Sequence, residues 1–161
     1  MKTLVALAML AAASFGINAG LWTATSMRTS RQTRADLDVA MHGEAFAHAK
    51  YLLFAKQARQ NGREDLAKLF EDAAATEHLE HFAEQAELAG LVGSDTDNLR
   101  DAIQGESHEV DALYAEFARK AAAAGDQQAA ARFEEIRKDE MKHRDAFKAA
   151  LERIEKVRME R

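Results

Sequence analysis

Four glutamates interrupt helical faces that are otherwise apolar. Residues spaced three, four or seven positions apart share one face of an α-helix, and four segments of this chain carry apolar side chains at that spacing. Each apolar stripe contains a glutamate near its middle, and these are Glu44, Glu77, Glu106 and Glu140. A carboxylate buried alone is costly and persists only when it is paired or bound to a metal ion. The residues that make up these stripes include no lysine or arginine, so the pattern favours bound divalent cations.

The position of one histidine indicates which metals would bind. His143 follows Glu140 by three residues, a spacing that places carboxylate and imidazole on one helical face. Diiron carboxylate bundles combine two such Glu-x-x-His pairs with a single glutamate from each of two other helices. Glu44 and Glu106 fit the single positions. Carboxylates with imidazoles suit two iron ions, or manganese, better than copper or a closed zinc site. The alternative for each residue taken alone is a solvated surface side chain.

Composition excludes several other kinds of site. The sequence has no cysteine, which rules out disulfides, thiolate nucleophiles, zinc fingers and iron–sulfur clusters. Residues 1–35 carry a charge of +4 and the whole chain −5, which leaves −9 for residues 36–161. Because nucleic-acid binding needs a basic surface, this acidic body argues against a nucleic-acid partner.

An internal duplication organises residues 36–161. Several residues recur 63 positions later: Phe54, Ala58, Gly62, Ala67, Phe70 and Glu77 return as Phe117, Ala121, Gly125, Ala130, Phe133 and Glu140. Gly43-Glu44 instead returns as Gly105-Glu106, at an offset of 62. One residue is therefore inserted between Glu106 and Phe117. A helix usually absorbs such an insertion as a π-bulge, and π-bulges are frequent at functional sites.

Each half of the duplication is predicted to form a helical hairpin. Helix-forming residues dominate the composition, proline is absent, and no run of alternating β-branched residues suggests a strand. The expected helices are 36–61, 63–89, 97–124 and 126–161, with glycines at the two hairpin turns. A chain of 161 residues is long enough for one domain. The expected fold class is therefore all-α, a four-helix bundle built from two repeated hairpins.

These helices resemble those of the rubrerythrin family. The matching motifs are Gly43-Glu44, Tyr51 and Phe54-Ala55 in the first helix, Asn98-Leu99 through Gly105-Glu106, Glu109, Tyr114 and Phe117-Ala118 in the third, and Phe133 with Glu140-x-x-His143 in the fourth. The agreement covers about residues 36–155. The resemblance implies a ferritin-like bundle with a diiron centre that reduces hydrogen peroxide to water.

The resemblance also implies roles for particular residues. The iron ligands would be Glu44, Glu77, Glu106, Glu109, Glu140 and His143. Tyr51 and Tyr114 would hydrogen-bond to ligand carboxylates. The predicted function is peroxide reduction in oxidative stress defence. Two other classes remain as alternatives: an iron-oxidising or iron-binding protein, and a metal-stabilised bundle without catalysis.

Two features depart from the family pattern. The family has a histidine three residues after the second-helix glutamate, whereas this chain has Glu80 there, in the repeat position of His143. Glu80 is predicted to be the ligand at this place, and a local bulge that brings His81 inward is the alternative. Full-length rubrerythrins also carry a cysteine-rich rubredoxin module that supplies electrons. Since this sequence has no cysteine, we expect an external electron donor.

The N-terminal segment is expected to lie outside the domain. A positively charged start, an apolar run and small residues up to Ala19 are typical of a secretory signal peptide over residues 1–19. The alternatives are an uncleaved membrane anchor over residues 1–23 and a buried helix. The first two predict an exported, periplasmic or membrane-anchored protein. Residues 20–35 are basic and lack apolar periodicity, so they are predicted to be a flexible spacer.

A short linker between the hairpins predicts how chains assemble. In a ferritin-like bundle the third helix runs parallel to the second, so the connection must return along the bundle. The second helix, of about 27 residues, is ~40 Å long, and the roughly six residues from Gly90 to Asp95 reach only ~20 Å. We therefore predict a domain-swapped homodimer, in which the first hairpin of one chain packs on the second hairpin of the other.

Overall fold

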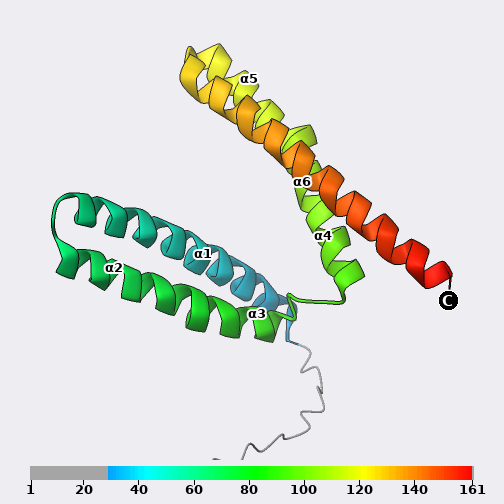
Figure 1. The fold of residues 1–161 in the computed structure, drawn as a ribbon, viewed down its shortest axis with the longest axis horizontal. Coiled ribbons are helices and arrows are strands. Elements are labelled where there is room, and N and C mark those ends of the chain that lie inside the picture. Colours follow the sequence, from blue (N-terminus) through cyan, green and yellow to red (C-terminus); the bar gives the residue numbers. More distant parts are fainter. Residues whose placement is uncertain (1–28, 161) are drawn as a thin grey trace, which may run out of the picture.

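The computed structural model describes residues 29–160, which form two helical hairpins (Figure 1). The first hairpin pairs α1 (Arg31–Gln60) with a continuous helical rod made of α2 (Glu64–Thr76), the π-helix η1 (Glu77–Phe82) and α3 (Ala83–Ala89). The second pairs a rod made of α4 (Asp95–His108), the π-helix η2 (Glu109–Leu113) and α5 (Tyr114–Ala124) with α6 (Gln127–Met159). The described residues contain no strand. The all-α prediction and the two repeated hairpins are confirmed.

Local sequence explains where the helices begin and end. Ser30 and Ser94 cap α1 and α4, and their hydroxyls accept hydrogen bonds from the backbone N–H groups of Thr33 and Asp97 at 3.0 and 3.3 Å. The hairpin turns fall at Gly62 and at Gly125, where φ is +71° and +88°. Residues with a Cβ rarely adopt this left-handed conformation, so glycine is the expected residue at both turns.

Two sequence predictions concern residues that lie wholly or mostly outside the described part of the chain. The predicted signal peptide or anchor, residues 1–19, lies outside them, as does most of the predicted spacer 20–35. Because α1 already begins at Arg31, the last five residues of that spacer are helical. In the described part of the chain, no helix is both long enough and apolar enough to span a membrane.

Small side chains let the two helices of each hairpin approach closely. The buried residues between α1 and its partner rod are mostly alanines, among them Ala55, Ala58 and Ala67, and Ala118 and Ala130 lie in the second hairpin. Val110 is the largest side chain that is completely buried in the described residues. Each hairpin therefore buries only a narrow seam.

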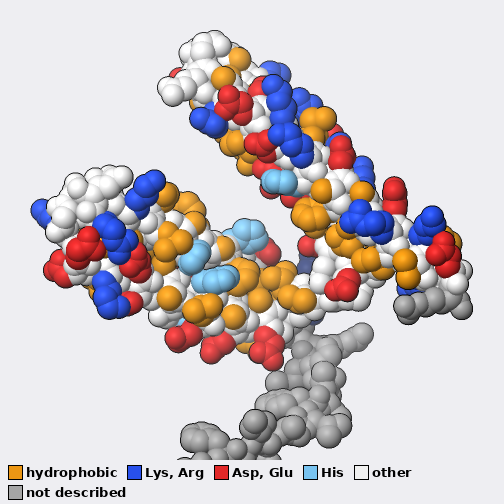
Figure 2. All heavy atoms as spheres, in the orientation of Figure 1, with side chains coloured by type: hydrophobic (Ala, Val, Ile, Leu, Met, Phe, Trp, Pro, Cys, Tyr) orange, Lys and Arg blue, Asp and Glu red, His pale blue; other side chains and the backbone are white. Residues whose placement is uncertain are grey.

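The two hairpins of one chain do not pack against each other. Within residues 29–160, helix contacts occur inside each hairpin and none joins α1–α3 to α4–α6. Figure 1 shows the hairpins diverging from a linker of five residues, 90–94, that joins α3 to α4. Phe54 and Phe117, which are equivalent in the two repeats, remain 44% and 36% exposed. On the face of the first hairpin seen in Figure 2, hydrophobic side chains and histidines gather along the middle, and acidic side chains lie at its lower edge.

Candidate metal centre

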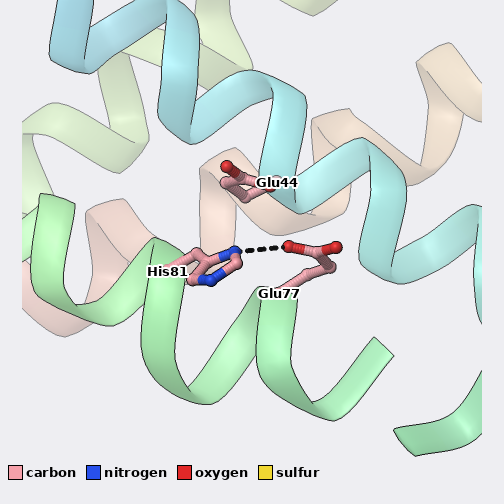
Figure 3. Close-up of side chains that lie close together, drawn as sticks. All are labelled: Glu44, Glu77 and His81. Carbon is pink, nitrogen blue, oxygen red and sulfur yellow. Dashed lines mark hydrogen bonds and ion pairs between the residues drawn. The ribbon is translucent and has the colours of Figure 1, made fainter. Parts of the chain in front are cut away.

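One cluster of possible metal ligands lies inside the first hairpin. Glu44 comes from α1, and Glu77 and His81 come from η1 (Figure 3). One potential ligand atom of each residue lies within 4.8 Å of those of the other two. His81 Nδ1 is 2.8 Å from Glu77 Oε2, and this hydrogen bond raises the pKa of His81. Both carboxylates are partly buried, whereas the imidazole is half exposed.

The second hairpin contains an equivalent cluster. Glu106 from α4 meets Glu140 and His143 from α6, again with ligand atoms within 4.8 Å of one another. His143 Nδ1 lies 2.7 Å from Glu140 Oε2 and 3.9 Å from Glu106 Oε1. Burial, followed by the neighbouring Glu140 carboxylate, raises the pKa of Glu106. The duplication has thus produced one Glu–Glu–His cluster in each hairpin.

The donor set fits a metal ion. Glu106 Oε2 is buried and has no hydrogen-bond partner, although a buried polar atom is normally satisfied. In the described residues, Glu77, Glu106 and Glu140 form ion pairs with histidine alone, and no lysine or arginine pairs with any of the four cluster glutamates. Carboxylate oxygen and imidazole nitrogen are the ligands that iron and manganese accept. A cation would satisfy the unpaired oxygen and offset the repulsion between the carboxylates.

The π-helix η1 determines which residue follows Glu77 into the cluster. In an uninterrupted α-helix, Glu80 and His81, three and four residues after Glu77, would lie on either side of the Glu77 face. In the wider π-turn His81 comes directly beside Glu77, while Glu80 is exposed and outside the cluster. The alternative with His81 is the one that the structure supports, and ligation by Glu80 stays a prediction.

A signal in the sequence could have identified His81. The repeat offset is 63 at Glu77 and Glu140, but His81 and His143 are 62 residues apart. One extra residue therefore lies between Glu77 and His81, just as one lies between Glu106 and Phe117. Each insertion coincides with a π-helix in the structure. The predicted π-bulge between Glu106 and Phe117 is confirmed as η2.

Glu109 and Tyr114 flank this second π-helix. Glu109 is the first residue of η2 and is partly buried, but it is not one of the three clustered ligands. Burial raises the pKa of Tyr114, as do the nearby carboxylates of Glu109, Glu140 and Glu106. The phenol therefore stays protonated at neutral pH and can donate a hydrogen bond to a carboxylate. The structure places Tyr114 next to the predicted ligands.

Tyr51 and Tyr114 belong to two equivalent aromatic groups. The rings of Tyr51, Phe54 and Phe70 pack together in the first hairpin. Those of Tyr114, Phe117 and Phe133 do so in the second. The Phe–Phe centroid distances are 5.4 and 5.5 Å, within the range of favourable aromatic contacts. Each hairpin therefore carries an equivalent aromatic group of one tyrosine and two phenylalanines.

Comparisons with known proteins agree on one family. The model described as "Rubrerythrin" matches residues 36–81 and 77–151, which include both clusters. "Rubrerythrin" of Porphyromonas gingivalis is 34% identical over 136 residues, which cover 77% of this chain and 68% of the relative. "Nigerythrin" of Nitratidesulfovibrio vulgaris is 34% identical over 136 residues, covering 76% and 67%. "Putative rubrerythrin" of Methanocaldococcus jannaschii is 28% identical over 147 residues, covering 78% and 72%.

Proposed function

The chain belongs to the rubrerythrin family, and from this premise we propose that it reduces hydrogen peroxide to water with electrons from an external donor. The observation that carries the proposal is the pair of equivalent Glu–Glu–His clusters, one of which holds a buried carboxylate oxygen without a partner. The reaction consumes two electrons and two protons for each peroxide, and yields two molecules of water.

The residues divide into ligands and surroundings. The ligands would be the two clusters together with Glu109, and a bound iron pair would hold peroxide and supply its two electrons. The protonated phenol of Tyr114 is suited to fix a ligand carboxylate by a hydrogen bond. The aromatic groups around Tyr51 and Tyr114 would keep water from one end of the site, which strengthens the electrostatic interactions inside it.

Each proposed site needs both hairpins, and we propose that they come from two chains. A cluster of three ligands in one hairpin is half of the expected diiron set. The five residues of the linker span about 17 Å when extended, whereas the rod from Glu64 to Ala89 is ~39 Å long. The linker is too short for the return that a ferritin-like arrangement within one chain requires. A domain-swapped dimer would bring the exposed Phe54 of one chain and Phe117 of its partner into one core.

The function is tested with the full chain loaded with Fe(II) under exclusion of oxygen. We expect about two irons per chain and rapid oxidation by stoichiometric hydrogen peroxide, with turnover when an artificial reductant is added. Glu140→Ala should lose at least one iron and the activity. Glu135→Gln changes an exposed glutamate that pairs with Arg132 on the same helix. This control variant should retain its two irons and its peroxidase activity.

Three results would contradict the proposal. Two irons retained in the Glu106→Ala/Glu140→Ala double variant would show that the site is elsewhere. A preference for oxygen with accumulation of iron would indicate an iron-oxidising protein. A loaded protein that turns over neither oxidant would indicate a metal-stabilised bundle without catalysis.

A further inference from the structure

In each hairpin, a side chain of one helix forms a hydrogen bond with a backbone carbonyl of the other helix. The described residues contain two such bonds between helices, one in each hairpin. In the first hairpin, His48 Nδ1 of α1 lies 2.8 Å from the carbonyl oxygen of Ala74. In the second, Arg137 Nε of α6 donates to the carbonyl oxygen of Val110 at 2.8 Å. Both bonds are partly buried, and both lie at or beside a π-helix.

The carbonyl of Val110 has lost its usual helical partner. In an α-helix it would accept from the N–H of Tyr114, four residues later. In η2 the Tyr114 N–H instead donates to the carbonyl of Glu109, five residues before it. Val110 is almost completely buried, so water is not at hand to replace the lost bond. Arg137 supplies the missing donor.

The π-turn that Arg137 caps sets the register of Tyr114 against Glu106. Tyr51 follows Glu44 by seven residues, which leaves the two about 20° apart around an α-helix. Tyr114 follows Glu106 by eight residues, which would place it about 80° away in an uninterrupted α-helix. The extra residue absorbed by η2 returns Tyr114 to the face of Glu106. The raised pKa of Tyr114, caused by burial and three carboxylates, agrees with this placement.

His48 takes the corresponding place in the first hairpin. Since a carbonyl only accepts, the His48 Nδ1 atom carries the proton of this bond. Ala74 lies in the last turn of α2, directly before η1, and η1 brings His81 beside Glu77. Unlike the carbonyl of Val110, that of Ala74 also accepts from the Glu77 N–H, so His48 adds a second hydrogen bond at the turn from which η1 begins.

We propose that Arg137 and His48 are positioning residues that hold the two π-turns in register, Arg137 for Tyr114 and His48 for His81. Neither needs to touch a metal ion. The metal-related part of this inference rests on the proposed function, whereas the structural part does not. The two parts are therefore separated in the test.

The structural part is tested on the metal-free full chain by amide hydrogen exchange. Arg137→Met removes the donor and keeps an unbranched side chain, so the amides of η2 and Tyr114 should exchange at least tenfold faster. Arg137→Lys restores a donor and should recover most of the protection. Glu134→Gln is the matched control, because it removes the charge of the other partner of Arg137 (3.4 Å) and leaves the Val110 bond in place. His48→Phe should have the same effect on η1, with exposed His42→Phe as its control.

The ligand part is tested by iron affinity and the absorption spectrum of the loaded protein. Arg137→Met and His48→Phe should weaken iron binding about tenfold, as losses of outer-shell partners do, and should change the spectrum. The proposal is overturned if η2 exchanges unchanged in Arg137→Met and η1 exchanges unchanged in His48→Phe. If one of these variants does not fold, unchanged exchange in the other overturns it. A protein that binds no iron, yet shows the predicted exchange, would refute the proposed function and leave the positioning roles standing.

Discussion

The acidity of Glu106 follows from its place among other carboxylates. Burial and the neighbouring Glu140 raise its pKa above the usual 4.5. A carboxyl group that binds its proton more tightly in the folded state stabilises the fold below its unfolded pKa. That contribution is lost as the pH rises through the folded pKa. In the absence of metal, Glu106 should therefore destabilise the fold at neutral pH.

Glu106→Gln tests this cost directly. With a chelator present, the variant should melt above the unsubstituted protein at pH 7, by about 2–4 °C for each 1 kcal/mol of repulsion relieved. The difference should shrink as the pH falls below 4.5, where the Glu106 carboxyl becomes protonated in both the folded and the unfolded state. Thermal unfolding followed by circular dichroism measures both trends. A variant that melts below the unsubstituted protein at pH 7 would show that Glu106 carries no such strain.

Iron should reverse the order of stability. A ligand that binds only the folded state raises its stability, and a neutral amide at position 106 removes one anionic ligand. Iron should therefore raise the melting temperature of the unsubstituted protein more than that of Glu106→Gln. Glu135→Gln should respond like the unsubstituted protein, because that exposed residue lies outside the cluster.

At the scale of the helix, η1 separates two candidate ligands by a single residue. Adjacent residues point about 100° apart around a helix, so Glu80 and His81 cannot occupy the same place in one register. The structure puts His81 against Glu77 and leaves Glu80 exposed. Whether His81 or Glu80 binds iron therefore tests whether the π-turn persists in the metal-bound protein.

We expect His81→Ala to lower the iron content and change the spectrum of the loaded protein. Glu80→Ala should leave both nearly unchanged, because the Glu77–His81 contact remains. Iron analysis and absorption spectroscopy on the two variants decide the matter. Loss of iron in Glu80→Ala with retention in His81→Ala would mean that the helix takes up a regular α-helical register when metal binds.

For the whole molecule, the proposed domain swap makes the two hairpins complementary halves of a site. In a swapped dimer, Glu44 and Glu77 of one chain share a site with Glu106, Glu140 and His143 of its partner. A Glu44→Ala chain combined with a Glu140→Ala chain then regenerates one intact site in each heterodimer. Iron content and peroxidase activity of the co-refolded mixture should exceed those of either variant alone. A monomer in solution that binds two irons would rule the swap out.

The N-terminal segment gives a second prediction at this scale. If residues 1–19 are a cleaved signal peptide, the mature chain starts near Gly20 and is found outside the cytoplasm. Mass spectrometry of protein isolated from its native host measures the start directly. An intact start in the membrane fraction would indicate an anchor instead. An intact start in the soluble fraction would contradict both predictions.

The helices, the duplication and most members of the two candidate clusters could be predicted from sequence because they depend on local periodicity. Glu44, Glu77, Glu106 and Glu140 interrupt apolar stripes, and the spacing of His143 places it beside Glu140. The shift of the repeat offset from 62 to 63 revealed η2. Short-range rules fix these features, since a helical face is defined by residues only three to seven positions apart.

Tertiary structure decided what depends on contacts between helices. His81 lies directly beside Glu77, with Glu80 turned away, because these residues form a π-turn, and His48 of α1 contacts the Ala74 carbonyl just before this turn. The hairpins are separate because α3 packs on α1 whereas α4 packs on α6, and only the five linker residues connect the two pairs. Periodicity alone predicts neither the place of His81 nor the separation of the hairpins. One inserted residue turns every later side chain by about 100° around the helix. Only a bulge stabilised by a neighbouring helix absorbs that rotation.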